Sequence, residues 1–208
     1  MRIFFILLIV FFSFSFSFAQ HRSDYNEDDS YDDVPSLFSV GVLGSGYVPL
    51  GSDKELLGYG AGAGLKAVIN MNKFFGIGLS TSLTGAKSNY NGGNNSTLLS
   101  TTRLLFIFQK ETDRFQKGFV PWFGLGIGLT ALFGDYSIGK TKGMVGFDMT
   151  LMAGLRYNFK NAYVGIGAEY ITIGISGDMV YNNKYQTRET TSIDISGVNI
   201  FGEIGFRF

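Results

Sequence analysis

Residues 119–134 read FVPWFGLGIGLTALFG, and this stretch limits the fold of the chain more than any other. Its residues form two alternating rows. The first row is apolar throughout: Phe119, Pro121, Phe123, Leu125, Ile127, Leu129, Ala131 and Phe133. The second row has small residues at its middle: Val120, Trp122, Gly124, Gly126, Gly128, Thr130, Leu132 and Gly134. A period of two is typical of an extended strand. Bulk on one face and space on the other favours a strand that turns one face to lipid and the other to a narrow barrel interior.

Seven more stretches after residue 35 show the same alternation. Together with the first they predict eight strands: 37–48, 58–70, 74–86, 98–109, 119–134, 146–159, 163–175 and 194–208. Each holds 12 to 16 residues, and a tilted strand needs roughly 9–11 residues to cross a bilayer. The connections are 49–57, 71–73, 87–97, 110–118, 135–145, 160–162 and 176–193. They mostly alternate between long and short, with 110–118 as the exception, which is the layout of a barrel with short periplasmic turns, longer outside loops and both termini in the periplasm.

The expected fold class is therefore all-β, an eight-stranded antiparallel up-and-down transmembrane β-barrel over residues 36–208. Closure leaves no unpaired strand edge in lipid, where unsatisfied backbone groups are not tolerated. No run of 18 or more apolar residues follows the N-terminal stretch, so we expect no transmembrane helix in the mature protein. The rival fold is a soluble lipocalin-like carrier, which also has eight strands but keeps its apolar side inside.

The first 35 residues are expected to lie outside the barrel. Residues 1–19 carry an early Arg, an apolar core and small residues before a cut between Ala19 and Gln20, the pattern of a secretory signal peptide. An uncleaved anchor helix is the alternative. Residues 20–35 hold six acidic residues and one Arg without apolar periodicity, so we expect a flexible periplasmic lead-in. The single histidine, His21, lies there, and we expect it in a solvated tail rather than at a metal.

Charged residues also fall on the inward rows of the predicted strands: Lys66, Arg103, Arg156, Glu169, Glu203 and Arg207. Asp148 lies on the same side, nearer the outer mouth. The interior of an eight-stranded barrel is just wide enough for side chains to fill, and an unpaired buried charge is costly. We therefore expect these groups to pair as a lumen charge network that closes a polar interior. A gate or a small-ion path is the alternative.

Composition excludes several classes of function. The chain has no Cys, so it has no disulfide framework and no thiolate metal site. The net charge of +4 from residue 36 onward is too small to indicate a surface that binds nucleic acid. Activation of a hydroxyl needs a general base such as His, and residues 36–208 contain none. We therefore expect no enzyme activity, no cofactor and no bound metal.

The glycines and aromatic residues of the strands have structural explanations. Gly60, Gly62 and Gly64, like the glycines of 119–134, keep a period of two and open no helix, so they are not phosphate loops. We expect them to leave room for the inward charges and for Trp122. Aromatic residues near the strand ends predict interfacial girdles. The girdle residues are Tyr59, Phe147 and Tyr170 at one end, and Phe75, Phe108, Tyr157, Phe159, Phe206 and Phe208 at the other.

Three motifs resemble those of a family, the small bacterial outer-membrane β-barrel domain proteins (eight-stranded barrels like OmpA, OmpX and OmpW). The PWFGLGIG core of 119–129 resembles the P-Y-x-G-x-G-x-G strand of that family, and the AGLRY of 153–157 resembles its A-G-x-R-Y strand. The terminal Phe206 and Phe208 resemble the aromatic-x-aromatic end that the barrel-assembly machinery recognises, although Glu203 stands where that signal usually has Gly. The signal-peptide end and the composition resemble proteins of Bacteroidetes-type bacteria.

This resemblance implies the outer membrane of a Gram-negative bacterium as the location. It also implies contact with outer-membrane lipid and with the assembly machinery during insertion. The leading hypothesis for function is non-enzymatic: membrane integrity, or surface interaction through loops 176–193 and 87–97. One alternative is an accessory component of a transport or secretion complex that contacts a protein partner through the acidic lead-in and the periplasmic turns. Another is a narrow pore.

Overall fold

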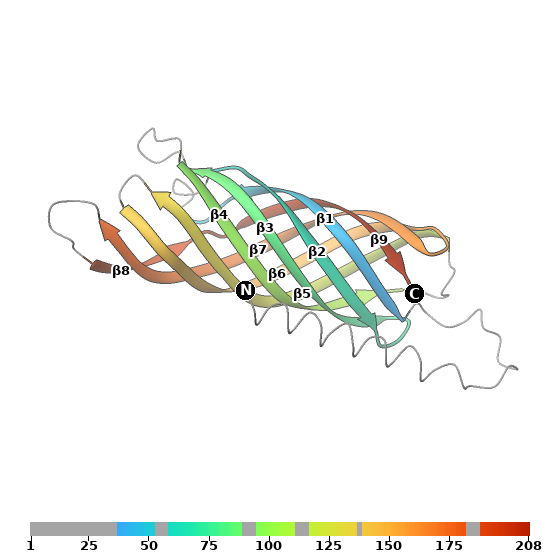
Figure 1. Cartoon of the computed structure of the whole chain (residues 1–208). Coiled ribbons are helices and arrows are strands. Elements are labelled where there is room, and N and C mark those ends of the chain that lie inside the picture. Colours follow the sequence, from blue (N-terminus) through green and yellow to red (C-terminus); the bar gives the residue numbers. More distant parts are fainter. Residues whose placement is uncertain (1–36, 53–57, 89–94, 111–116, 137–138, 182–187) are drawn as a thin grey trace, which may run out of the picture.

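The chain folds into a closed antiparallel barrel, seen in the computed structural model, which describes residues 37–52, 58–88, 95–110, 117–136, 139–181 and 188–208 (Figure 1). The strands are β1 Phe38–Pro49, β2 Gly60–Asn70, β3 Phe75–Ser88, β4 Asn95–Gln109, β5 Gly118–Tyr136, β6 Gly139–Asn158, β7 Ala162–Tyr181, β8 Arg188–Asp194 and β9 Gly197–Arg207. Among these residues, no helix is long and apolar enough to cross a membrane.

Strand pairing confirms the predicted eight-stranded barrel. Consecutive strands pair from β1 to β7, β9 pairs with β7, and the pairing of β1 with β9 closes the ring. All pairs are antiparallel. Phe38 and Phe208 exchange backbone hydrogen bonds of 3.3 and 2.8 Å where β1 begins and β9 ends. We call this end of the barrel the terminal end and the opposite end the outer end.

The eighth strand of the barrel is interrupted, and its two parts are β8 and β9, which both pair with β7. The side chain of Asp194 accepts hydrogen bonds from the backbone N–H and the hydroxyl of Ser196 at 3.0 and 2.6 Å. The hydroxyl of Ser196 in turn accepts a hydrogen bond of 3.2 Å from the backbone N–H of Ile173 on β7. Side chains thus replace part of the backbone ladder here, which is why the strand predicted to begin at residue 194 is divided at residues 195–196.

Two predicted loops, 135–145 and 176–193, are wrong, because more than half of their residues are strand, and strands also take up 87–88 and 95–97 of the predicted loop 87–97. Within 135–145, β5 continues to Tyr136 and β6 starts at Gly139. Within 176–193, β7 continues to Tyr181, as its Met179–Tyr181 portion suggested, and β8 starts at Arg188. These segments extend past the last residues of β4 that pair with β5, so they lie beyond the closed ring at the outer end (Figure 1). No lipid-facing row is needed there, and the alternation that marks a membrane strand is therefore lost.

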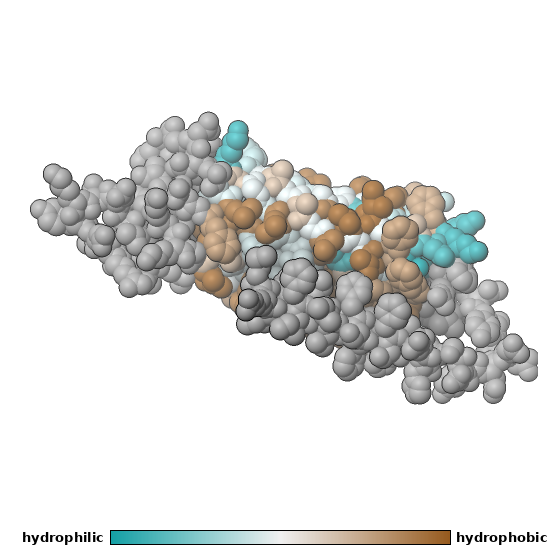
Figure 2. All heavy atoms as spheres, in the orientation of Figure 1, coloured by the Kyte–Doolittle hydropathy of each residue, from teal (hydrophilic) through white to brown (hydrophobic). Residues whose placement is uncertain are grey.

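The exterior of the wall is an apolar band, as the first row of 119–134 predicts. The exposed residues of β5 include Phe119, Phe123, Leu125, Ile127, Leu129 and Phe133. Figure 2 shows hydrophobic side chains along the middle of the barrel and hydrophilic ones toward its ends. At the terminal end the expected girdle aromatics contact one another: the rings of Phe75 and Phe108 lie 5.3 Å apart, and those of Tyr157 and Phe159 lie 5.0 Å apart. An apolar exterior excludes the soluble lipocalin-like alternative, whose apolar side lies inside.

The interior is less polar than the sequence analysis predicted, because two apolar clusters share it with the charges. The outer cluster contains Tyr47, Ala86, Leu99, Leu132, Met144, Ile171, Ile173, Ile175 and Ile195. The inner cluster contains Val68, Leu105, Ile107, Trp122, Met152 and Phe201, with Leu43 packed against it. Several of these residues come from β4 and β7, whose inward rows hold apolar side chains beside charged ones such as Arg103 and Glu169. The charged members marked these rows as polar, so the sequence analysis did not predict the apolar clusters.

The inward glycines provide space for neighbouring side chains, although not always for those expected. A Cβ on Gly128 would lie 2.6 Å from Cγ of Arg103, in agreement with the predicted room for a charge. Trp122 is accommodated by a different glycine, Gly154 on β6, whose Cβ would lie 2.8 Å from the indole ring. Strand register determines these contacts, because each glycine faces a residue on a neighbouring strand.

Candidate functional site

The candidate site is the lumen, where buried polar side chains join strands that are not neighbours in the wall. Three groups of contacts cross the interior. We call them the central network, the Lys66–Glu203 pair and the terminal network, and each is built from inward positions of two or more strands.

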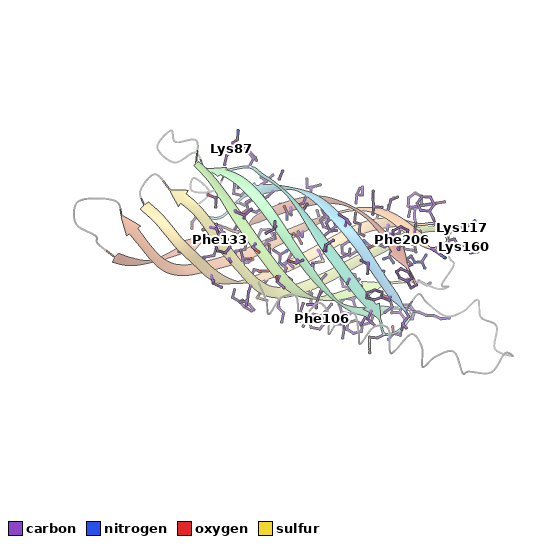
Figure 3. The ribbon with its side chains drawn as sticks, in the orientation of Figure 1. Lys87, Phe106, Lys117, Phe133, Lys160 and Phe206 are labelled. Carbon is purple, nitrogen blue, oxygen red and sulfur yellow. The ribbon has the colours of Figure 1, made fainter. Side chains whose placement is uncertain are left out.

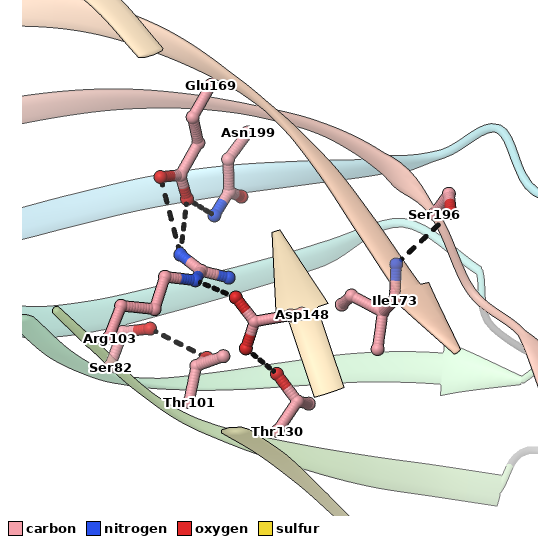
Figure 4. Close-up of polar contacts among 9 residues, drawn as sticks. All are labelled: Ser82, Thr101, Arg103, Thr130, Asp148, Glu169, Ile173, Ser196 and Asn199. Atoms are coloured by element: carbon pink, nitrogen blue, oxygen red, sulfur yellow. Dashed lines mark hydrogen bonds and ion pairs between the residues drawn. The ribbon is translucent and has the colours of Figure 1, made fainter. Parts of the chain in front are cut away.

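The central network is organised by Arg103 of β4, which is only 4 % exposed (Figure 4). Its Nε donates to Oδ1 of Asp148 on β6 at 2.5 Å. Its Nη1 donates to both carboxylate oxygens of Glu169 on β7 at 3.2 and 3.3 Å. One guanidinium therefore pairs with two carboxylates from two further strands, one of them on the far side of the ring.

Neutral side chains complete the central network. Thr130 of β5 donates its hydroxyl to Oδ2 of Asp148 at 2.8 Å, and Asn199 of β9 donates its amide to Oε1 of Glu169 at 2.9 Å. Asp148 is fully buried. Such a carboxylate is stable as an anion only when a cation and further donors compensate for its lost hydration. Arg103 and Thr130 supply them here.

The second group is the salt bridge between Lys66 of β2 and Glu203 of β9. The two strands are separated by β1, so the pair spans an inward arc of the wall. The ammonium of Lys66 also lies 4.6 Å from the ring centroid of Trp122, which projects from β5. Rings of Trp122 and Phe201 lie 6.0 Å apart. The pair therefore sits against the inner apolar cluster, where a cation over an aromatic face is stabilised.

The terminal network joins two arginines to neutral side chains and to a backbone carbonyl in the contacts that the structure describes. Arg156 of β6 donates to the side-chain oxygen of Gln109 at 3.0 Å, and Gln109 donates to Oδ1 of Asn70 at 3.1 Å. The guanidinium of Arg156 lies 4.9 Å from the ring centroid of Tyr163. Arg207 donates to the carbonyl of Phe159 at 3.4 Å. These contacts fill the terminal end of the lumen.

A cavity of about 30 Å³ remains between the central network and the inner cluster, and its walls include Lys66, Arg103, Trp122 and Asn199. Nε1 of Trp122 and Oδ1 of Asn199 are buried without a hydrogen-bond partner among the described residues. A cavity of this size has room for about one water molecule. The space is thus suited to an internal water and too small for a solute.

The six charges predicted to form one network belong to separate groups. The structure brings Lys66 to Glu203 and Arg103 to Glu169. The described contacts of Arg156 and Arg207 are with Gln109 and with the carbonyl of Phe159, and Arg156 and Glu203 flank the same residue, Gly165. Asp148 pairs within the lumen as expected, with Arg103, whereas Asn199 was not foreseen as a partner. Both stand on inward rows, but only the register shows that Asp148 and Arg103 flank the same residue, Gly128.

The other predicted positions are exterior or outside the described residues. Phe206 and Phe208 are exposed on the outer surface of β9 and directly after it, at 60 % and 56 %. Their role as an assembly signal stays a prediction. Ala19, Gln20 and His21 lie outside the described residues. Among the described residues, no group of three or more His, Cys, Asp or Glu side chains could hold a metal ion.

At the outer mouth, Asp194 fixes the junction of β8 and β9. Hydrogen bonds from the hydroxyl and the backbone N–H of Ser196 hold the pKa of this exposed carboxyl below its ordinary value. The backbone N–H of Ser52 contributes at 3.4 Å. The carboxylate form is therefore the one that the folded mouth favours.

Comparisons with known proteins agree with this architecture. No family model matches the sequence, and no curated protein matches it. Solved barrels do resemble the structure. The outer membrane protein OprG from Pseudomonas aeruginosa has 14 % identity over 86 % of this chain and 99 % of its own, with a TM-score of 0.64. Neisserial surface protein A has 16 % identity over 83 % of this chain and 98 % of its own, with a TM-score of 0.59.

A third structure, the N-terminal β-barrel domain of OprF from Pseudomonas aeruginosa, has 14 % identity over 84 % of this chain and 99 % of its own, with a TM-score of 0.51. At these identities the likeness shows the fold. The apolar exterior of the present barrel indicates that it spans an outer membrane, because closed β-barrels with such a band do so. The chain is an integral outer-membrane protein with the fold of the small eight-stranded barrels.

Proposed function

We propose that this chain is a non-enzymatic outer-membrane barrel whose salt-bridged interior is closed to solutes and whose outer hairpins make surface contacts or support membrane integrity. The observation that carries the proposal is the central network, in which Arg103, Asp148 and Glu169 meet across the lumen. Two apolar clusters and the terminal network fill the space on either side. The cavity beside the central network, at about 30 Å³, is too small for a solute and argues against the narrow-pore alternative.

The absence of enzyme activity is part of the proposal. The only histidine of the chain is His21, outside the barrel. The charged groups of the lumen are held in ion pairs, and a paired carboxylate is a poor general base. The outer hairpins β5–β6 and β7–β8, which extend beyond the ring, are the features most suited to contact other surfaces.

Conductance in planar bilayers tests the closed lumen. We expect no steady channel from the wild-type barrel, and an increase in leak from the double variant Arg103→Ala/Asp148→Ala, which removes the centre of the network. The matched control is Thr102→Ala/Met149→Ala, which changes the adjacent exposed residues and should leave the barrel closed. Steady wild-type channels of defined size would overturn the proposal in favour of a pore.

Shortening the β7–β8 hairpin separates the two roles offered for the barrel. Gly177 pairs with Thr191, so the chain can be rejoined there with the wall intact. In a strain that lacks the protein, dye exclusion restored equally by full-length and shortened barrels would assign the role to membrane integrity. Intact dye exclusion in the strain that lacks the protein would assign the role to surface contact, with the hairpin as the segment to probe.

A further inference from the structure

The outer end of the barrel carries a long strand edge on β8. This strand, Arg188–Asp194, pairs with β7 along its whole length, and no other described strand pairs with it. Toward the membrane, β1 pairs with β9 as far as Gly197, and the backbone N–H groups of Leu50 and Gly51 then donate to the carbonyl of Ser196. The side of β8 that faces away from β7 is therefore unpaired among the described residues, and we call it the open edge (Figure 1).

The register shows which backbone groups lie on the open edge. Neighbouring residues of an antiparallel strand direct their N–H and C=O groups to opposite sides. The N–H of Ile195 donates to the carbonyl of Ile173 on β7 at 3.2 Å, and the pairing of β8 continues in the same register. The odd-numbered residues of β8 therefore point to β7, and the even-numbered Arg188, Thr190 and Ser192 point to the open edge. This edge presents three N–H donors and three C=O acceptors.

The open edge lies beyond the apolar band of the wall. Figure 3 shows Lys87 and Phe133 toward the outer end of the barrel and Phe206 toward the terminal end. The outward row of β5 changes from the exposed Phe133 to Asp135, and Asp194 at the membrane-proximal end of β8 is exposed. An unpaired edge is not tolerated in lipid, whereas in water it is a template for another strand.

The middle of the open edge lacks the features that usually prevent strand addition. Natural sheets protect an edge with Pro, with charged residues, with a bulge or by keeping the strand very short. Residues 190–193 are Thr, Thr, Ser and Ile, without charge or Pro, and Thr and Ile favour strands. On the other margin of the outer sheet, β5 extends past its last pair with β4 by only two residues, Asp135 and Tyr136. An added strand is therefore expected at β8.

We propose that the open edge of β8 binds an extended peptide segment of a partner protein by strand addition. Main-chain hydrogen bonds supply the affinity in this mode of recognition, and the side chains of the added strand supply the specificity. The proposal rests on the proposed surface role of the outer hairpins, and it names the strand and the chemistry of the partner. The added strand is antiparallel, like every pair of this barrel, so it begins opposite Asp194 and ends opposite Arg188.

The charges at the two ends of β8 define the sequence that fits. Opposite charges directly across an antiparallel pair are stabilising, and like charges are destabilising. The partner segment therefore carries a basic residue opposite Asp194, a basic residue opposite Glu189 and an acidic residue opposite Arg188. Residues with high strand propensity lie between them, opposite the uncharged middle of β8.

A second copy of the chain in the same membrane does not fit the open edge. Strands of outer-membrane barrels are tilted by about 35–45° from the barrel axis. Two copies inserted in the same orientation have β8 strands that both run from the outer side toward the membrane. Antiparallel pairing needs one of the two strands to run the other way, which a shared membrane forbids.

A synthetic peptide tests the open edge directly. The probe is the peptide KTVTVKE with blocked ends and a fluorescent label, whose three charged residues lie opposite Asp194, Glu189 and Arg188. Its counterpart ETVTVEK reverses these charges. Fluorescence anisotropy measures binding to the full mature chain reconstituted in vesicles of neutral lipid. We expect saturable binding of KTVTVKE and binding at least about tenfold weaker for ETVTVEK, because like charges replace opposite charges at three positions.

Proline variants locate the contact on the backbone. Thr190→Pro removes an N–H from the open edge and leaves the hydrogen bonds to β7 in place, and Pro is tolerated on an edge in this orientation. It should weaken the binding of KTVTVKE about tenfold, since one main-chain hydrogen bond is lost. Ser192→Pro should act in the same way. Thr190→Ala keeps the N–H and is the matched control, which should bind like the wild type. Heat-modifiable migration on gels verifies that each variant is folded.

Four results would overturn the proposal. The first is no saturable binding of KTVTVKE to the folded wild type, and the second is equal binding to both proline variants and the wild type. The third is binding that appears only after residues 53–57 are replaced by a Gly-Ser linker, which would make that loop the occupant. The fourth is vesicle aggregation abolished by Thr190→Pro, which would make a second copy in a facing membrane the occupant. None of these readouts depends on conductance or dye exclusion, so a failure here is distinguishable from a failure of the proposed function.

Discussion

The two faces of the barrel wall follow different rules. On the outward face, side chains such as Leu125 contact lipid, and any apolar residue of similar size serves equally well. On the inward face, a residue such as Leu105 touches particular side chains from other strands. Lipid chains adapt to the shape of the outward face, whereas the inward side chains must pack against one another. An apolar residue of suitable size is therefore enough at an outward position, whereas an inward position requires a side chain that fits particular neighbours.

The largest expected difference between the two faces is that between two leucines. Leu105 is 1 % exposed inside the barrel, and Leu125 is 48 % exposed on its exterior. Leu105→Ala should lower the free energy of unfolding by about 3 kcal/mol, because it leaves a cavity in a packed interior. Leu125→Ala should lower it by about 1 kcal/mol, because lipid chains fill the space and only transfer energy is lost.

Urea titrations of both variants in the same lipid measure the two losses. Equal losses would mean that the interior relaxes as readily as lipid does. That outcome would contradict the contrast between the faces.

A second, smaller effect compares two strand glycines. A Cβ on Gly154 would lie 2.6 Å from the carbonyl oxygen of Ile166 and 2.8 Å from the Trp122 ring, whereas a Cβ on Gly44 meets nothing within 4 Å. Gly154→Ala should therefore cost about 2 kcal/mol through overpacking. Gly44→Ala serves as the control and should be neutral or slightly stabilising.

Tryptophan fluorescence gives an independent readout, because Trp122 is the only tryptophan of the chain. Its emission should shift in Gly154→Ala and stay unchanged in Gly44→Ala. An unshifted emission together with an unchanged stability in Gly154→Ala would show that the indole does not pack against this glycine.

The smallest effect lies beyond both faces, at the outer mouth. The pKa of Asp194 is lowered in the folded state, so its contribution to stability is present above its ordinary value of about 3.9 and is lost as pH falls through the lower folded value. The protection of β8 amides, taken relative to their intrinsic exchange rate at each pH, should fall over that acid range in the wild type. Asp194→Asn should show lower protection at neutral pH and a smaller further loss in acid. An identical acid response in both proteins would contradict the assignment to Asp194.

The outward face explains why so much of the fold was predictable. A lipid-facing row must be apolar at every second residue, so eight such rows could be counted in the sequence and closed into a barrel. The inward charges could also be assigned to the lumen. Their partners could not, because pairing depends on the register and tilt of strands far apart in the sequence. Arg103 and Asp148 are 45 residues apart and meet only because β4, β5 and β6 align them around Gly128.

The sequence by itself thus determined the strand count, the closed antiparallel topology and the polarity of the two faces, because these follow from local alternation and from the need to satisfy the backbone in lipid. Only the tertiary structure decided which charges pair, where apolar clusters fill the lumen and how far the outer hairpins extend. The tertiary structure also decided that the last strand of the barrel is divided at Asp194 and Ser196. These features depend on contacts between distant strands, for which no local pattern exists.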